Sequence, residues 1–158
     1  MRPTFFWLCL LTHSGCLPLT FAHEGEIDFT VYRSVNVVDV VLSAPDLGLA
    51  DEASQPTLAA YLVDELRTDS GFRTVTSTYG SAQTQLMVRM RLARVDTGIS
   101  LTPSDRIDGT VQFELSNQRG AIVVSGEFSQ SGSDNDVPGL QASLLDDVAH
   151  FFLRPYRI

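Results

Sequence analysis

The segment spanning residues 55–75 constrains the fold of this chain more than any other. Leucines recur at every fourth position across residues 58–66, and charged side chains occupy the other side of that stretch. This 3.6-residue period predicts an amphipathic helix, which needs a second surface to bury its apolar face. Pro56 suits the first helical turn, and Gly71 is expected to end the helix in a left-handed conformation. A short strand is expected over residues 72–76.

Apolar and polar residues alternate in three later segments, which predicts the sheet that this helix covers. Residues 85–95 alternate most regularly, and residues 110–116 and 121–128 repeat the pattern on either side of a hairpin connection. One face of each strand should therefore be buried. Gly120 should supply the positive φ of the connection, and Gly126 is a candidate bulge. The inward-facing positions are expected to be Leu86, Val88, Met90, Leu92, Val111, Phe113, Leu115, Ile122, Val124 and Phe128.

The first strand is harder to delimit because its alternation changes phase. Residues 27–42 predict either one long strand with a bulge near residues 33–34 or two strands with a tight break. Residues 43–54, 96–108 and 130–135 are rich in polar or turn-forming residues, and they are expected to form loops.

A second amphipathic helix is expected over residues 138–153. Because each helix has one apolar face, both helices should pack on the same side of the sheet. The expected fold class is therefore α+β, a two-layer sandwich with a mostly antiparallel sheet of four to five strands and two helices on one face. The other sheet face would then carry Arg89, Arg91, Gln112, Glu114 and Glu127.

The first 22 residues have the pattern of an export leader. Arg2 precedes an apolar run at residues 5–11 that is too short to span a bilayer, and small and polar residues follow it. Cleavage after Ala22 would leave His23 as the first residue of the mature chain. Residues 23–158 are then expected to form a single α+β domain.

The leader also offers a second processing route, through a lipid anchor. Residues 14–16 (Ser-Gly-Cys) resemble the end of a bacterial lipoprotein box, in which Cys16 would become a diacylated first residue. His13 departs from that box, where leucine or a similar apolar residue is usual. Both routes predict an exported protein, either periplasmic or anchored to the outer membrane of a Gram-negative bacterium. Both cysteines of the chain lie in the leader, so the folded part contains no thiol and no disulfide.

The charge of the chain argues against several classes of partner. The net charge is −8, and all 11 basic residues are arginine. An acidic surface disfavours nucleic acids and anionic lipid head groups, so membrane contact is expected only through Cys16. The absence of lysine excludes Schiff-base lysine chemistry and a P-loop lysine.

No catalytic residue and no cofactor are expected. The acidic pairs at 64–65 and 146–147 are adjacent on helices, so their side chains diverge by about 100°. Asp134 and Asp136 are not followed by the glutamate that would complete a calcium loop, and helix capping is the better interpretation. The sequence also lacks the nucleophile elbow of a serine hydrolase.

A remote alternative is a secreted metal-dependent enzyme. A mature chain that begins at His23 would offer copper both a free amine and an imidazole, as in copper-dependent polysaccharide monooxygenases that resemble this start. Such a site needs a second histidine, for which only His150 remains. His150 is expected at the edge of the second helix, which argues against this site.

Arg89 and Arg91 are the candidate binding residues. They share the outer face of one predicted strand about 7 Å apart. Two guanidinium groups in this position could hold a carboxylate, a phosphate or an acidic partner. The alternative is a solvated sheet face on which both arginines pair with Glu114 or Glu127 across strands.

The order of elements over residues 27–153 resembles that of small periplasmic lipoproteins of Gram-negative bacteria. The shared features are Cys16 in the leader, a first strand, the helix ending LVDELRTDSGF, a strand meander and a C-terminal helix. Auxiliary lipoproteins of ABC-type lipid transport systems and the lipopolysaccharide-assembly lipoprotein are similar in this architecture. The resemblance implies a non-enzymatic accessory subunit of an envelope transport or assembly system, with an envelope protein as partner.

The alternative function is a periplasmic carrier of an apolar ligand. Five phenylalanines could line a cavity between the helices and the sheet, although they could equally form an ordinary packed core. They are Phe72, Phe113, Phe128, Phe151 and Phe152.

Overall fold

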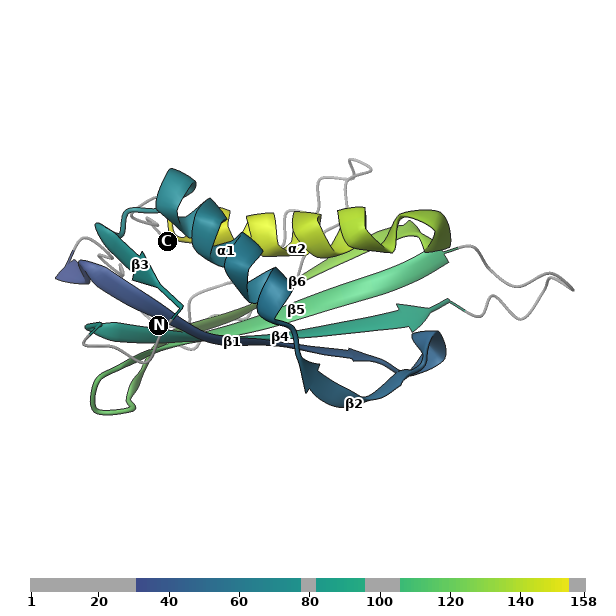
Figure 1. Ribbon diagram of the computed structural model, residues 1–158, viewed down its shortest axis with the longest axis horizontal. Coiled ribbons are helices and arrows are strands. Elements are labelled where there is room, and N and C mark those ends of the chain that lie inside the picture. The colour runs from purple at the N-terminus through teal and green to yellow at the C-terminus, as the bar shows by residue number, and fades with distance from the viewer. Residues whose placement is uncertain (1–30, 78–81, 96–105, 154–158) are drawn as a thin grey trace, which may run out of the picture.

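The computed structural model describes residues 31–77, 82–95 and 106–153 of the chain. These residues form one six-stranded sheet with two helices on one of its faces, as Figure 1 shows. The predicted α+β sandwich is thus confirmed. In chain order, the elements are β1 (Ser34–Ala44), the 3-10 helix η2 (Pro45–Leu47), β2 (Leu49–Ser54), α1 (Pro56–Asp69), β3 (Thr74–Thr76), β4 (Thr84–Arg94), β5 (Arg106–Asn117), β6 (Ile122–Ser133), the 3-10 helix η3 (Asp134–Asp136) and α2 (Val137–Phe151).

The sheet is mixed, although most of its pairings are antiparallel. Its strand order is β2-β1-β4-β5-β6, and β3 pairs with β1 beyond the end of β2. β1 is antiparallel to β2 but parallel to β3 and β4, whereas β4–β5 and β5–β6 are antiparallel. The parallel pairs follow from α1, because a helix that crosses over the sheet returns the chain in its original direction.

β2 is the strand that the sequence did not predict, because it falls within the expected loop at residues 43–54. Its sequence, LADEAS, has none of the β-branched residues that mark a strand. The pairing is imposed by the tight turn that precedes it, in which Gly48 has a φ of 87°. β5 and β6 likewise extend into the loops expected at residues 106–108 and 130–133, and serine and glycine weaken the alternation in the second of these.

A bulge in β1 lies at Val38, not near residues 33–34 as the sequence predicted. Val37 is opposite Leu86 and Asp39 is opposite Met87, so Val38 is the extra residue. The bulge shifts the inward positions from odd to even numbers, and Val35 and Val37 are followed in the core by Val40, Leu42 and Ala44. A continuous apolar run hides this shift in the sequence.

A second bulge lies in β6 at Val123, not at Gly126. Ser116 pairs with Ile122, whereas Leu115 pairs with Val124. The extra residue turns Ile122 to the outer face, where its side chain is 56% exposed. The expectation that Ile122 faces inward is therefore wrong, while the other nine inward positions expected in these strands are buried.

Gly126 has a packing role instead. It lies opposite Phe113, and a Cβ at this position would be 2.7 Å from the Phe113 ring. The ring is itself enclosed by other aromatic side chains, with centroid distances of 4.8 Å to Phe151 and 5.6 Å to Phe152. Phe72 and Phe128 complete a buried cluster, in which Phe72 contacts Phe152 and Phe128 stacks on Phe113. The five phenylalanines thus form part of the packed core between helices and sheet.

The end of α1 differs from the prediction for Gly71. Gly71 does not have a positive φ, whereas Gly120 does, with a φ of 76°, as the sequence predicted. α1 ends at the extended Ser70, whose N–H donates to the carbonyl of Leu66 over 3.1 Å. Gly71 then donates its N–H to the Phe152 carbonyl over 3.2 Å, which ties the end of α1 to the end of α2.

Candidate binding face

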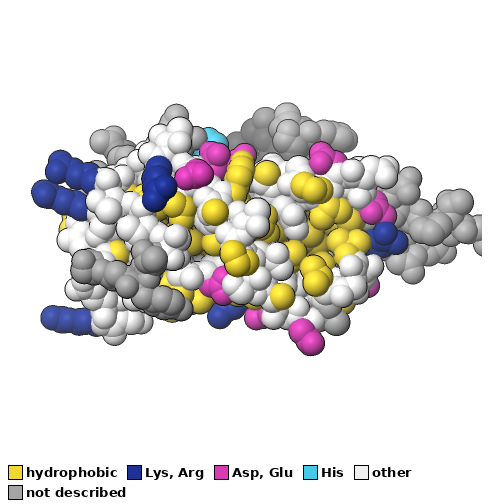
Figure 2. Space-filling view, viewed as in Figure 1, with side chains coloured by type: hydrophobic (Ala, Val, Ile, Leu, Met, Phe, Trp, Pro, Cys, Tyr) yellow, Lys and Arg dark blue, Asp and Glu magenta, His cyan; other side chains and the backbone are white. Residues whose placement is uncertain are grey.

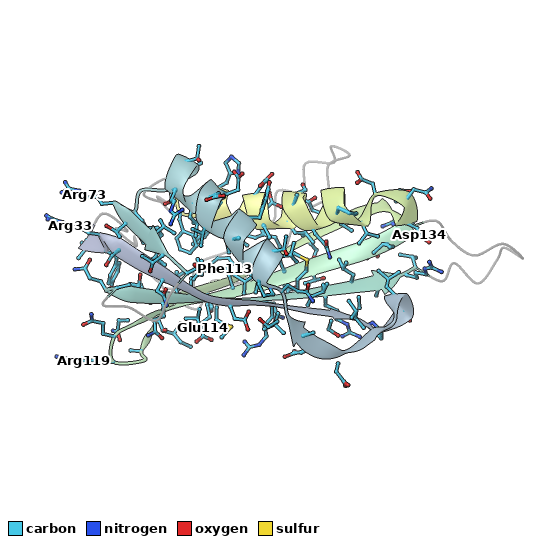
Figure 3. The ribbon with its side chains drawn as sticks, viewed as in Figure 1. Arg33, Arg73, Phe113, Glu114, Arg119 and Asp134 are labelled. Carbon is cyan, nitrogen blue, oxygen red and sulfur yellow. The ribbon has the colours of Figure 1, made fainter. Side chains whose placement is uncertain are left out.

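The face of the sheet opposite the helices is polar and open. Figure 3 shows Phe113 between the sheet and the helices, and its neighbour Glu114 on the other side of the sheet. This outer face carries mainly hydroxyl, amide and charged side chains along β4, β5 and β6. Hydrogen bonds between strands order part of it, including Gln112 to Glu127 over 2.7 Å and Ser131 to Asp108 over 2.6 Å.

Arg89 and Arg91 lie at the centre of this face, as the sequence predicted. Arg89 is opposite Gln112 and Arg91 is opposite Thr110, and both arginines are exposed. Neither guanidinium has a hydrogen bond or ion pair with any other described residue. The expected cross-strand ion pairs are not formed among these residues, because Glu127 accepts from Gln112 and Glu114 lies opposite Met87.

A groove of ≈ 540 Å³ runs along this part of the outer face. It combines guanidinium donors with hydroxyl, amide and carboxylate groups, a mixture suited to a polar partner that carries at least one anionic group. Glu52 and Ser43 complete its far wall, and no pattern in the sequence indicated them because residues 43–54 were expected to form a loop. Its polar lining includes Ser43, Glu52, Arg89, Arg91, Gln112 and Glu127.

Most of the carboxylates considered for chemistry have structural partners instead. Asp134 forms an ion pair with Arg94 over 2.6 Å, and Asp136 caps α2 by accepting from Gly139 over 3.0 Å. The capping interpretation is thus confirmed for Asp136. Asp147 accepts from Gln130, so it is tied to β6.

The described residues contain no group of three or more histidine, cysteine or acidic side chains that could hold a metal ion. His150 is exposed near the end of α2, and its Nδ1 lies 2.8 Å from the Asp146 carbonyl oxygen. His23, Cys16 and the two expected processing sites lie outside the described residues. Neither of the two described helices is long and apolar enough to cross a membrane.

Tyr61 has a raised pKa, and its hydroxyl links the two helices. Tyr61 of α1 donates its hydroxyl to Asp146 Oδ1 of α2 over 2.8 Å. This hydrogen bond, together with burial and the nearby charges of Asp146 and Glu65, raises the pKa of Tyr61 to about 12. The bond favours the neutral phenol, so its role is to hold α1 against α2.

Comparison with known proteins places the fold. No family model matches the sequence, and no curated protein matches it. The structure is similar to the PelC dodecamer from Paraburkholderia phytofirmans, with a TM-score of 0.57 and 18% identity over 86% of this chain and 98% of that chain. A point variant of that dodecamer gives a TM-score of 0.56 and 18% identity over 89% and 100% of the two chains.

A weaker likeness is to a minor lipoprotein from Acinetobacter baumannii, with a TM-score of 0.42 and 16% identity over 78% of this chain and 91% of that chain. At this TM-score the likeness carries no weight. The two PelC structures match nearly their whole length, and at 18% identity that match concerns the fold. The described domain therefore has the fold of a PelC subunit.

Proposed function

We propose that this chain is an exported, non-enzymatic accessory protein of a Gram-negative cell envelope, which works by assembling with copies of itself and binding a partner through its outer sheet face. The observation that carries the proposal is the full-length match to the subunit of a dodecamer. The export leader predicted for residues 1–22 and the candidate lipidation site at Cys16 support the location. The open polar face supports a binding role, because the helices cover only the other side of the sheet.

The partner of the outer face would be an acidic surface of an envelope protein. Arg89 and Arg91 are exposed, lie on one strand and have no counter-ion among the described residues. Each guanidinium group can bind one carboxylate through two parallel hydrogen bonds. The apolar-carrier alternative is less favoured, because the five phenylalanines that would line its cavity contact one another.

Self-assembly is tested by the mass of the purified mature protein in solution. Multi-angle light scattering and native mass spectrometry should both give a closed oligomer at micromolar concentration. A monomer over the whole concentration range would contradict the proposal. The same mass spectra would reveal a co-purified lipid, which would favour the carrier.

The mass of the N-terminal peptide of the mature protein tests whether Cys16 carries a lipid anchor. A diacylated Cys16 would establish a lipoprotein held at the membrane, whereas a chain that begins at His23 would establish a free periplasmic protein. A chain that retains residues 1–15 would contradict export by either route.

A further inference from the structure

We infer that copies of this chain associate head to tail, with a basic end of one copy against the acidic end of the next. The inference rests on the proposed self-assembly and identifies the two surfaces that would meet. Figure 3 shows Arg33, Arg73 and Arg119 at one end of the long axis and Asp134 at the other.

Three arginines form the basic end, defined as Arg33, Arg73 and Arg119. The backbone brings the first two together, because Arg73 donates its N–H to the Arg33 carbonyl over 2.9 Å. Arg119 lies in the β5–β6 hairpin, which turns at the same end of the sheet. All three side chains are exposed, and none has a hydrogen bond or ion pair with another described residue. Figure 2 shows dark blue side chains projecting from this end.

The acidic end lies at the opposite ends of the same strands. Asp46, Asp51 and Glu52 follow β1, and Asp134 and Asp136 follow β6. Two described arginines at this end are engaged, Arg94 with Asp134 and Arg106 with Asp108, while Arg89 and Arg91 share the outer-face groove with Glu52. Asp51 and Glu52 are exposed and have no hydrogen bond or ion pair with another described residue, so this end retains an excess of negative charge.

The exposed apolar side chains fall at the same two ends. Among the described residues, the large hydrophobic side chains that are exposed are Val31 (64%), Ile122 (56%), Leu49 (39%) and Leu153 (38%). Val31 and Ile122 lie beside the basic end. Leu153 lies there as well, because the carbonyl of the preceding residue, Phe152, accepts a hydrogen bond from Gly71, two residues before Arg73. Leu49 lies two residues before Asp51 at the acidic end. Apolar contacts rimmed by arginine and carboxylate are typical of protein interfaces.

The two charged ends cannot neutralise each other within one molecule. The 11 residues of β1 separate them by about 35 Å, several times the Debye length of about 8 Å in physiological salt. A second copy can bring them into contact. Because the contact joins two different surfaces, it repeats from copy to copy and produces a ring where the rotation closes.

An anionic membrane is the other surface that the basic end could meet. The net charge of −8 opposes this, because an anionic bilayer repels the rest of the molecule. A second copy offers the same opposite charge without that repulsion. The charges therefore favour a second copy of this chain, and not a membrane, as the partner of the basic end.

The test compares three variants of the mature protein by light scattering. R33E/R119E reverses the charge of the basic end, and D51R/E52R removes the excess negative charge of the acidic end. R89E/R91E, which changes the net charge as much as R33E/R119E does but on the outer sheet face, is the matched control. Circular dichroism and thermal melting confirm that each variant is folded.

The expected result is that each end variant alone loses the oligomer, with subunit affinity at least about tenfold weaker, while the control keeps it. An equimolar mixture of the two end variants should form a heterodimer, because the native acidic end of R33E/R119E then meets the native basic end of D51R/E52R. The wild-type oligomer should weaken between about 50 mM and about 500 mM NaCl.

Two results would overturn the inference while leaving self-assembly intact: end variants with wild-type mass, or a mixture of the two end variants that forms no heterodimer. A monomeric wild type would overturn both proposals. Sedimentation with phosphatidylglycerol vesicles tests whether the basic end binds an anionic membrane instead. An R33E/R119E variant that stays oligomeric but no longer sediments with vesicles would assign the basic end to the membrane.

Discussion

The Phe113 ring approaches the backbone so closely that Gly126 is a sensitive position for any added side chain. A Cβ there would be 2.7 Å from the Phe113 ring, and the ring cannot retreat because Phe151 and Phe152 enclose it. Gly126→Ala should therefore lower the free energy of unfolding by about 1–3 kcal/mol, measured by urea denaturation.

Gly71→Ala is the matched control for that substitution. Gly71 does not have a positive φ, and a Cβ there would be 3.6 Å from the Phe152 carbonyl oxygen, an ordinary contact. Its free energy of unfolding should stay within about 0.5 kcal/mol of wild type. Equal losses in the two variants would mean that the Phe113 contact does not set the requirement for glycine.

The hydroxyl of Tyr61 gives the fold a pH dependence in the alkaline range. The pKa of Tyr61 is raised to about 12 in the folded state, against an ordinary value of 10.0. The neutral phenol therefore stabilises the fold fully below pH 10, and this contribution is lost as the pH rises through 12. Tyr61→Phe should lower the free energy of unfolding by about 1 kcal/mol at neutral pH.

The difference between wild type and Tyr61→Phe should shrink as the pH is raised from 10 to 12, when both proteins are followed by urea denaturation. Tyr32→Phe is the control, because the Tyr32 hydroxyl has no hydrogen bond with another described residue. A difference that stays constant with pH would show that the Tyr61 hydroxyl does not titrate with a raised pKa.

At the scale of elements, two neighbouring aspartates at the N-terminus of α2 have different roles. Asp136 accepts from Gly139 as the helix cap, whereas Asp134 forms an exposed ion pair with Arg94. Asp136→Ala should lower the free energy of unfolding by about 1 kcal/mol, because the backbone N–H of Gly139 loses its side-chain acceptor. Asp134→Ala should cost less than about 0.5 kcal/mol. Thermal melting that ranks them the other way would contradict the assignment of the cap.

Elements with strong periodicity were predictable from the sequence. The alternation in β4 put Leu86, Val88, Met90 and Leu92 in the core, and both helices lie where their apolar stripes indicated. β2 was missed because its sequence has no strand signal, and the turn at Gly48 is what places it against β1. The bulges at Val38 and Val123 were misplaced because an inserted residue changes the facing of a strand without changing its composition.

The candidate site was predictable only in part, and for a related reason. Arg89 and Arg91 were found because their strand alternates, and the structure confirms that they lie exposed on its outer face. Glu52 was missed with β2. The basic end could not be predicted from the sequence. Arg33, Arg73 and Arg119 come from three separate segments of the chain, and only the sheet topology brings them to one end.

At the scale of the whole molecule, the outer face has its own test. Arg89→Ala/Arg91→Ala should remove a partner that is cross-linked to the wild-type protein in intact cells, while leaving the melting temperature unchanged, because both side chains are exposed. Arg89→Lys/Arg91→Lys keeps the charge but loses the paired donors, so an intermediate loss indicates recognition of carboxylates by guanidinium geometry. Unchanged cross-links in both variants would mean that these arginines are only solvated.

The parallel pairing of β1 with β4 also constrains the order in which the strands of this chain can pair during folding. Val35 meets Thr84 across about fifty intervening residues, a large loop to close before any contact rewards it. If the chain crosses a membrane unfolded and N-terminus first, β1 emerges long before the strand that pairs along its length. Until then β2 and β3 can pair only with its two ends, so the middle of its apolar run stays without a partner strand while the intervening residues cross.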